Sequence, residues 1–548
     1  MRIIHRSGFS VMTAPAQTPA SPNGRRADAP LRNVLFVMCD QLRWDHLSCY
    51  GHPVLQTPHL DALAARGMRF DRAYVQSAVC VPSRMSFYTG RYVASHGSTW
   101  NHVPLPAGQV TLGEMLVAHG RHATLAGKTH VIPDRAGIHR FGIDPESQMG
   151  QLILGGGFMQ LDRYDGHSPP GYESGYADYL RAQGYDSADP WTDFVIGGRD
   201  ETGARQDGWL LRNAHLPSFV EERHSETAYM TDRAIDFVRR QGDTPWVLHL
   251  SYIKPHWPLL APAPYHDMYR GYEQAPVKNA RELEEAHPVL AAYRRAHDDC
   301  RSYADDAVVR HVRPTYMGFV KQVDDHLGRL MAELKRLGRL DDTLIVFTSD
   351  HGDHFGDHSL GEKEIFYEAA VRVPMIIVDP RAQADATRGT ASDRFVEAID
   401  VLPTMLESIG LPVPTHLVEG RSLLPLLQGD APSDWRDQAF SELDYGFRDA
   451  RRDLGVPPAQ SRAWMVRTER WKYVHWLGMR PQLFDLREDP DEFVDLGADP
   501  GLAKVRAELR DRGTEQWTAM RIRTGVADEV VAARTEDWKR NGLQIGVW

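Results

Sequence analysis

The chain has 548 residues and a formal net charge of −11 at pH 7, which is long enough for one large core and a smaller second domain. The negative charge argues against nucleic acid as the main partner, because binding to phosphates requires a basic surface. The four cysteines are too few and too scattered for a disulfide framework, and no run approaches the roughly 18 apolar residues of a membrane span. We therefore expect a soluble cytoplasmic protein that binds neither nucleic acid nor membrane.

The N-terminal segment, residues 1–30, lacks the continuous apolar stretch of a secretory signal. It is rich in Ala, Pro, Thr, Ser and Gly, a composition that buries too little apolar surface to fold. The sequence therefore predicts a disordered leader, followed by a main domain over residues 31–437.

After the leader, short apolar runs alternate with amphipathic segments. The apolar runs are typical of strands buried on both faces, and the amphipathic segments have the three-to-four spacing of helices. This alternation favours an α/β domain built on a doubly wound sheet. In chain order we expect a strand at 33–39, a helix at 57–67, strands at 122–126 and 246–252 separated by a helix at 226–241, a helix at 312–338, and strands at 343–349 and 373–378.

Two segments depart from this alternation of strands and helices, and a C-terminal tail follows them. Residues 149–224 are rich in Gly, Asp, Tyr and Pro, and we interpret them as an insertion at the rim of a binding site. Residues 438–501 contain short alternating strands, for example over 462–476, and predict a smaller antiparallel subdomain. Residues 502–548 have helix-forming composition and end in the apolar letters GVW.

Carboxylates follow two of the predicted strands. Asp40-Gln41 follows the first strand, and Asp350-His351 follows the strand at 343–349. Because ligands of an open parallel sheet bind outside the carboxyl ends of the strands, these groups are placed to share one divalent cation. Taken singly, a carboxylate after a strand is more often a helix cap or a turn former than a metal ligand. His351, His354 and His358 also suggest zinc, although no cysteine accompanies them.

Cys80 opens the run CVPSRMSFYTGR, which predicts a loop entering a helix with Pro82 in its first turn. A cysteine at this point faces unpaired backbone N–H groups and the positive end of the helix dipole. That environment suits an anionic substrate or intermediate. The alternative is a buried structural cysteine beside a helix start.

Several motifs in order resemble one enzyme family. They are NVLFVMCDQLRWD, TPHLDALAARG, CVPSRMSFYTGR, AGKTH, KPHWPL and SDHGDHFGDHSLGEKEIFYEAAVRVPMII. Together they are similar to the formylglycine-dependent sulfatases and phosphonate monoester hydrolases of the alkaline phosphatase superfamily. The resemblance implies an alkaline-phosphatase-like mixed sheet with a smaller C-terminal α+β subdomain. The C-terminal runs PQLFDLREDPDEFVDL and ARTEDWKRNGLQIGVW resemble phosphonate monoester hydrolases in particular.

In this family the cysteine of the motif is oxidised to formylglycine by a formylglycine-generating enzyme, and the aldehyde hydrate attacks a small anionic ester. The resemblance therefore implies a covalent hemiacetal sulfate intermediate at Cys80. It also implies metal ligation by Asp40, Gln41, Asp350 and His351 together with residue 80, with calcium expected and manganese as the alternative.

The resemblance assigns further residues to the substrate and to proton transfer. Arg84 would position the formylglycine, Lys128 and Lys363 would hold substrate oxygens, and His256 would act as general acid. His130 would take the proton that lets the hemiacetal collapse, and Asn101 would contact the substrate. Without the motif order, the lysines would be read as surface residues and the histidines as turn or cap residues.

The preferred ester depends on one departure from the phosphonate hydrolase pattern. Those enzymes generally carry Tyr and Thr where this chain has Lys128 and His130, and the Lys/His pair is the sulfatase arrangement. Because function resides in the site, we expect a sulfatase of the arylsulfatase type. A phosphonate monoester or phosphodiester hydrolase is the alternative, and a non-catalytic anion-binding relative is a third.

The composition of the C-terminal tail predicts that the protein forms a homo-oligomer. An exposed apolar terminus such as Ile545, Val547 and Trp548 promotes aggregation of a soluble monomer. We therefore expect residues 502–548 to pack against a second subunit in a homodimer or homotetramer, as the resemblance also implies. The alternative is that the tail folds back on its own domain.

Overall fold

The computed structural model describes residues 29–166, 174–272, 274–535 and 540–542. The predicted leader falls almost wholly outside these residues, and so does the apolar GVW terminus.

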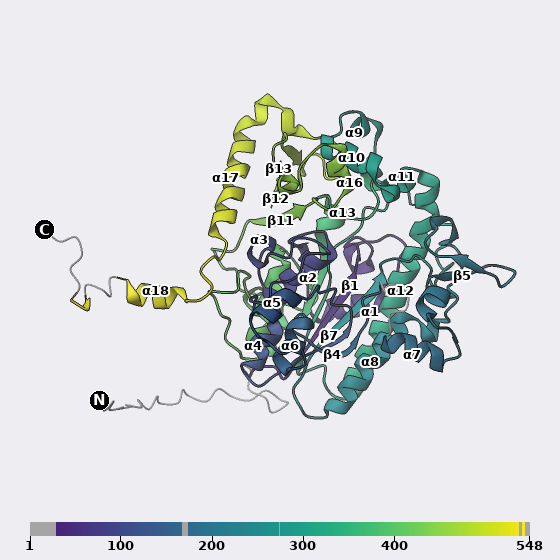
Figure 1. Cartoon of the computed structure of the whole chain (residues 1–548), viewed down its shortest axis with the longest axis horizontal. Helices are drawn as coiled ribbons and strands as arrows, with labels where there is room; N and C mark the ends of the chain where they lie inside the picture. The colour runs from purple at the N-terminus through teal and green to yellow at the C-terminus, as the bar shows by residue number, and fades with distance from the viewer. Residues whose placement is uncertain (1–28, 167–173, 273, 536–539, 543–548) are drawn as a thin grey trace.

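The main domain is built on an eight-stranded mixed sheet, in the order β10-β2-β9-β8-β1-β7-β3-β4. Strands β1, β7 and β4 of this sheet are labelled in Figure 1. Only β9 runs antiparallel to its two neighbours; β1, β3, β4, β7 and β8 form a parallel block. The strands are β1 (Asn33–Asp40), β2 (Met68–Tyr74), β3 (Ala123–Gly127), β4 (Met159–Arg163), β7 (Val247–Pro255), β8 (Thr343–Ser349), β9 (Arg372–Val378) and β10 (Thr390–Glu397).

Helices cover both faces of this sheet. Strand β1 explains why, because Leu35, Val37 and Cys39 enter one core while Val34, Phe36 and Met38 enter the other. Helices α1, α8 and α12 cover the first face, and α2, α4 and α14 cover the second. The helices of this domain are α1 (Pro58–Arg66), α2 (Cys80–Thr89), α3 (Val93–His96), α4 (Leu112–Val117), α5 (Arg135–Arg140), α6 (Gln148–Leu154), α7 (Gly175–Ala182), α8 (Glu226–Gln241), α9 (Ala280–Glu284), α10 (Pro288–Ala296), α11 (Asp298–Tyr303), α12 (Asp306–Arg336), α13 (Glu368–Val371), α14 (Val401–Ser408) and α15 (Leu424–Leu427).

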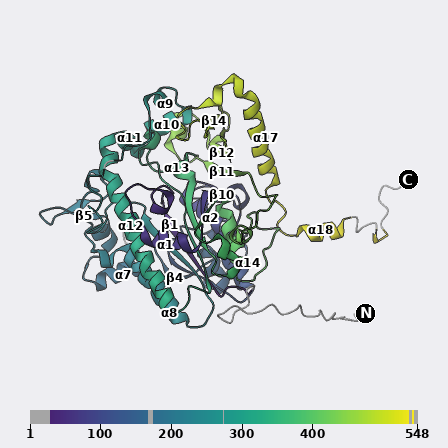
Figure 2. The same cartoon turned by 180° about the vertical axis from the view of Figure 1, so that it is seen from behind.

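A second sheet of four antiparallel strands forms the C-terminal subdomain, in the order β11-β12-β13-β14. Helix α17 packs on it, and α18 extends away from the body of the molecule in both views (Figures 1 and 2). The elements are β11 (Gln438–Asp444), α16 (Asp449–Asp453), β12 (Arg462–Thr468), β13 (Trp471–Trp476), β14 (Gln482–Asp485), α17 (Ala503–Ala519) and α18 (Asp528–Arg534).

The predicted elements are present with small shifts in their ends, and α8 and β8 agree residue for residue. Helix α12 begins at Asp306 rather than at residue 312, because Pro314 lies inside the helix and hides its first turns from a pattern search. The segment 149–224 has more regular structure than its composition suggested. It contains most of α6, the hairpin of β5 (Gly197–Arg199) and β6 (Arg205–Asp207), α7, and strand β4, which pairs with β3 in the central sheet.

Among the described helices, none combines the length and the apolar character that crossing a bilayer requires. The cytoplasmic location stays a prediction.

Candidate active site

The two strand-end carboxylates meet at one edge of the sheet. Strands β1 and β8 are parallel neighbours, with Cys39 opposite Ser349, so that Asp40 and Asp350 follow at the same level. Both carboxylates are fully buried. At this point the chain turns sharply, because Gln41 has a φ of 66° and donates its backbone N–H to Asp350 Oδ1 at 3.0 Å.

Cys80 approaches these carboxylates from the first residue of α2. Its Sγ lies 3.1 Å from His351 Nε2 and 3.7 Å from Asp40 Oδ1, and Lys363 Nζ lies 3.3 Å from the same sulfur. Asn101 Oδ1 accepts a hydrogen bond from the backbone N–H of Val81 at 3.0 Å, which satisfies one free donor of the α2 N-terminus. Burial and the charge of Asp40 raise the pKa of Cys80 to about 12, so the unmodified thiol is neutral at pH 7.

Arg84 lies one turn along α2 and is completely buried. Its Nε donates to Asp350 Oδ2 at 2.8 Å, and its Nη2 lies 3.5 Å from Asp40 Oδ2. Its Nη1 donates to the backbone oxygen of Lys128 and to Ser251 Oγ, each at 2.9 Å. One guanidinium therefore joins α2 to the ends of β1, β3, β7 and β8.

The position of Lys128 depends on the conformation of the preceding glycine, Gly127. Gly127 has a φ of +111°, and a Cβ there would lie 2.0 Å from the backbone oxygen of Ser251. Only glycine lets β3 end so close to β7. The next residue then places Lys128 Nζ 2.5 Å from Asp40 Oδ2, and both side chains are fully buried. Burial favours the neutral form of Asp40, but Lys128, His256 and Arg84 hold the pKa of its carboxyl well below the usual range.

Each carboxylate thus has one oxygen held by a cation and the other turned toward a shared centre. Asp40 Oδ1 and Asp350 Oδ1 both lie 3.6 Å from His351 Nε2. His351 Nδ1 lies 2.8 Å from the backbone oxygen of Gly352; a carbonyl only accepts, so Nδ1 carries the proton and Nε2 offers its lone pair. Burial lowers the pKa of His351, which favours this neutral form.

The donor atoms of Asp40, Cys80, Asp350 and His351 lie within 4.8 Å of one another, all on buried residues. Two carboxylate oxygens and an imidazole lone pair that converge in a buried cluster are a donor set that fits a divalent cation. His354 and His358, the other histidines of the zinc alternative, are not members of this cluster. Gln41 Oε1 accepts a hydrogen bond from Lys363 Nζ at 3.0 Å.

The remaining predicted residues line the pocket that leads to Cys80, whose volume is about 600 Å³. Asn101, His130, His256 and Lys363 are all on its wall. Sequence reasoning missed the rest of the pocket lining, which consists of Trp100, His102, Trp209, Trp257, Asp298, Asp299, Glu362, Glu364 and Arg448. Trp100 and Trp257 are sequence neighbours of predicted site residues, so their position in the chain could have indicated a role in the pocket. Asp299, Trp209 and Arg448 come from distant segments in which no motif indicates such a role.

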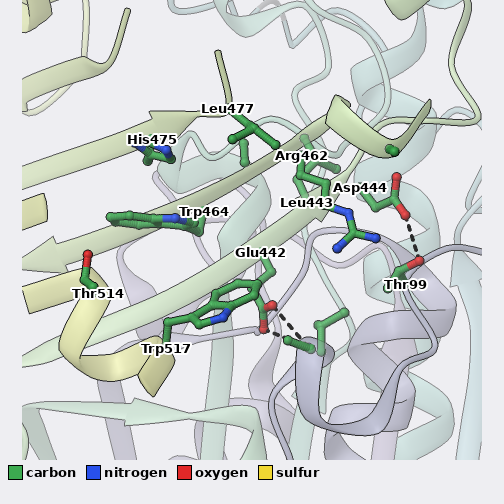
Figure 3. A pocket seen from close by; sticks show the side chains of 14 residues that line it. Thr99, Glu442, Leu443, Asp444, Arg462, Trp464, His475, Leu477, Thr514 and Trp517 are labelled. Carbon is green, nitrogen blue, oxygen red and sulfur yellow. Dashed lines mark hydrogen bonds between the residues drawn. The ribbon is translucent and has the colours of Figure 1, made fainter. Parts of the chain in front are cut away.

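A second cavity, of about 370 Å³, lies in the C-terminal subdomain between strands β11 to β13 and helix α17 (Figure 3). Trp464 and Trp517 form apolar walls, and Glu442 accepts a hydrogen bond from the backbone N–H of Ala94 at 3.1 Å (Figure 3). No site residue predicted from the sequence lines this cavity, so it is separate from the pocket at Cys80.

The sulfatase family model matches residues 32–411, more than half of the chain and all of the cluster around Cys80. The chain belongs to the sulfatase family. A second model, for the C-terminal part of N-sulphoglucosamine sulphohydrolase, matches residues 356–518. The predicted family and fold class are confirmed, and this sulfatase is a hydrolase acting on sulfuric esters.

Characterised relatives of this sulfatase include two kinds of bacterial enzyme. It is 34% identical over 505 residues to the multifunctional alkaline phosphatase superfamily protein PehA of Trinickia caryophylli, covering 86% of this chain and 93% of the relative. It is 29% identical to an arylsulfatase of Clostridium perfringens, with 85% and 90% covered. Among solved structures, phosphonate monoester hydrolase from Silicibacter pomeroyi superposes with a TM-score of 0.78 at 30% identity, over 91% of this chain and 98% of that one.

Removing either carboxylate should reduce the metal content of this sulfatase. We expect Asp40→Asn and Asp350→Asn each to purify with less divalent metal, because each loses an anionic oxygen from the shared centre. Asp350→Asn should also lower the free energy of unfolding by about 3 to 5 kcal/mol, since Arg84 is left buried without its partner. Elemental analysis and thermal denaturation measure the two effects.

Asp379→Asn is the matched control, because Asp379 is also a buried carboxylate after a strand but pairs with Arg381 at 2.6 Å. It should lose stability without losing metal. Undiminished metal in both site variants would reject the assignment of the cluster.

Proposed function

We propose that this sulfatase hydrolyses sulfate monoesters of the arylsulfate type, with formylglycine made from Cys80 as its nucleophile. The observation that carries the proposal is the position of Lys128, which is buried against Asp40 at 2.5 Å beside the Cys80 position. The neutral, enclosed thiol also supports it, because an unmodified cysteine with a pKa near 12 is a weak nucleophile at pH 7. Formation of the aldehyde requires a formylglycine-generating enzyme as a transient partner.

The proposed metal is calcium, with manganese as the alternative, held by Asp40, Gln41, Asp350, His351 and residue 80. Oxygen ligands favour calcium, whereas the imidazole of His351 is a softer ligand that manganese also accepts. When bound, the ion would lower the pKa of a hydroxyl at residue 80 and offset negative charge near it.

We assign charge stabilisation, positioning and proton transfer to the other residues in and around the pocket. Lys363 lies 3.3 Å from Cys80 Sγ, and Lys128 lies just behind Asp40, so both are placed to offset charge on sulfuryl oxygens. Arg84 fixes the α2 N-terminus relative to Asp350. His256 would protonate the departing alcohol oxygen, His130 would accept a proton at the residue 80 position, and Asn101 would contact the substrate.

A phosphonate monoester or phosphodiester hydrolase is the second candidate. It is favoured by the similarity in fold and sequence to phosphonate monoester hydrolases, at TM-scores of 0.78 and 0.77 and about 30% identity. We rank it second because Lys128 and His130 occupy positions where the resemblance leads us to expect Tyr and Thr in those enzymes.

Modification of Cys80 should be visible directly. Peptide mass spectrometry of the protein from its native host should find an aldehyde in place of the thiol at residue 80. Cys80→Ala should abolish sulfate ester hydrolysis and leave the circular dichroism spectrum unchanged, because the residue supplies the attacking oxygen. Cys49→Ala, a half-buried cysteine remote from the pocket, is the control. An unmodified Cys80 in fully active enzyme would reject the proposal.

Exchanging the Lys128–His130 pair should separate the two ester classes. We expect Lys128→Tyr with His130→Thr to lower kcat/KM for 4-nitrophenyl sulfate by about 100-fold or more, since the buried cation near the sulfuryl group is lost. Hydrolysis of phenyl phosphonate monoesters should fall far less. Equal losses on both esters would show that the pair is general machinery and would return phosphonate hydrolysis to first place.

We also propose that the tail joins subunits into a homodimer or homotetramer. Ile522 is 95% exposed, and Val526 and Val530 are also exposed, on a segment whose helix α18 extends away from the body (Figures 1 and 2). A seven-residue helix has little stability alone in water, and exposed apolar residues of this kind are typical of a subunit contact. The backbone of Arg521 still contacts Glu419 and Arg91, so the chain is anchored up to that point.

Truncation after Arg523 should therefore lower the molar mass of the particle measured by light scattering, while the fold and the pocket remain. Val526→Asp with Val530→Asp should have the same effect, because a charge disfavours an apolar contact. Glu529→Gln, on the same helix, should leave the molar mass unchanged. An assembly that persists in both altered proteins would reject a role of the tail.

A further inference from the structure

The pocket at Cys80 is lined by side chains of both charges. We propose that its mouth selects sulfate esters whose leaving group is an organic cation, such as an alkylammonium or arylammonium alcohol, and that Asp299 and Glu362 are the residues that set this preference. The inference rests on the proposed function, because it names the class of ester that the same site accepts.

The inner end of the pocket is positively charged. Lys363 Nζ lies 3.3 Å from Cys80 Sγ, and His130 and His256 lie on the same wall. Behind this wall, Lys128 and Arg84 pair with the two strand-end carboxylates. The sulfate end of an ester therefore belongs here.

Four carboxylates line the pocket, and two of them are neutralised by arginine side chains. Glu364 is bound by the guanidinium of Arg448, and Asp298 pairs with Arg301. Asp299, on helix α11, has no arginine or lysine within ion-pair distance among the described residues. Glu362 lies 3.6 Å from Lys363 Nζ, but that ammonium is shared with Cys80 Sγ and Gln41 Oε1.

Asp299 and Glu362 are close enough to affect each other. Burial and the charge of Glu362 together raise the pKa of Asp299 to about 6, so Asp299 still carries charge at pH 7. Two negative charges in a half-enclosed wall attract a cation and repel an additional anion more strongly than exposed charges do.

Tryptophan side chains line the same pocket as these carboxylates. Trp209 is 44% exposed at the pocket wall, and Trp257 is half-buried on the same pocket. The ring of Trp100 already has two partners: the guanidinium of Arg448 lies 5.6 Å from the ring centre, and Phe447 stacks on the ring. Trp209 and Trp257 therefore add indole rings to the pocket wall, and indole binds an organic cation better than an anion.

This arrangement complements a molecule with sulfate at one end and a positive charge at the other. It disfavours polyanionic esters, such as sugars that carry a second sulfate, because the additional anion would meet Asp299 and Glu362. A neutral aryl group would be held by the tryptophans alone and gain nothing from the carboxylates, which makes it the reference substrate.

The test compares three esters of matched shape: 4-(trimethylammonio)phenyl sulfate, 4-nitrophenyl sulfate and 4-carboxyphenyl sulfate. For each ester, kcat/KM is measured in the full-length enzyme and in Asp299→Asn and Glu362→Gln. Because each ratio compares two proteins with one ester, differences in intrinsic reactivity cancel. Asp298→Asn is the matched control, since Asp298 lies on the same pocket but is exposed and pairs with Arg301.

We expect each of the two variants to lower kcat/KM for the cationic ester about fivefold relative to the neutral one, and to raise the relative value for the anionic ester by a similar factor. Asp298→Asn should change both ratios less than about twofold. The cationic preference of the unaltered enzyme should also weaken with added salt.

Ratios that do not change in either variant, or an anionic ester that is accepted as well as the cationic one, would overturn the inference. Calorimetric binding of the three corresponding benzenesulfonates keeps the result separate from the proposed function. If no sulfate is hydrolysed but the cationic sulfonate still binds best and loses this advantage in Asp299→Asn, the proposed function fails and the selectivity holds. Equal binding of the three sulfonates overturns the selectivity.

Discussion

The buried guanidinium of Arg84 holds the active centre together, and most of the site depends on it. It donates to Asp350 at 2.8 Å, approaches Asp40 at 3.5 Å, and also binds the backbone of Lys128 and the hydroxyl of Ser251. A buried charge is tolerated only when partners surround it. Four strand ends and the N-terminus of α2 must therefore keep their relative positions for the fold to remain stable, and these same positions assemble the site.

This constraint explains how two buried carboxylates stay close together. Asp40 and Asp350 would repel each other, yet each has one oxygen neutralised by a cation, Lys128 in one case and Arg84 in the other. The other oxygen of each turns toward His351 and Cys80. The cationic side chains thus perform a structural task and leave a preorganised set of donors, which costs little further rearrangement when a cation or an anionic ester arrives.

The scaffold and the pocket give different indications about the substrate. The overall fold is similar to phosphonate monoester hydrolases, while sulfatases also stand among the relatives. A fold of this kind supports several ester hydrolyses, so the argument has to rest on the side chains near residue 80. There we propose that the buried Lys128 favours sulfate and that Asp299 and Glu362 on the pocket wall favour a cationic leaving group.

The sequence by itself determined the parts whose signal is local. Apolar runs located the strands β1 and β8, and amphipathic spacing with helix caps located α1 and α8. Both signals can be recognised within a short stretch of sequence. The strand-end positions of Asp40 and Asp350 and the motif around Cys80 predicted a shared centre before any geometry was known. The roles of Lys128, His130 and His256 in turnover came only from the family resemblance and remain to be tested.

Only the tertiary structure decided the rest. Asp299, Trp209 and Arg448 come from separate segments that meet at the pocket mouth, and no local pattern marks them. Helix α12 extends past Pro314, and β4 takes the sheet edge beside β3 from within a segment of irregular composition. Such outcomes depend on long-range packing and on charge pairs between distant residues, whose free energy is absent from any short stretch of sequence.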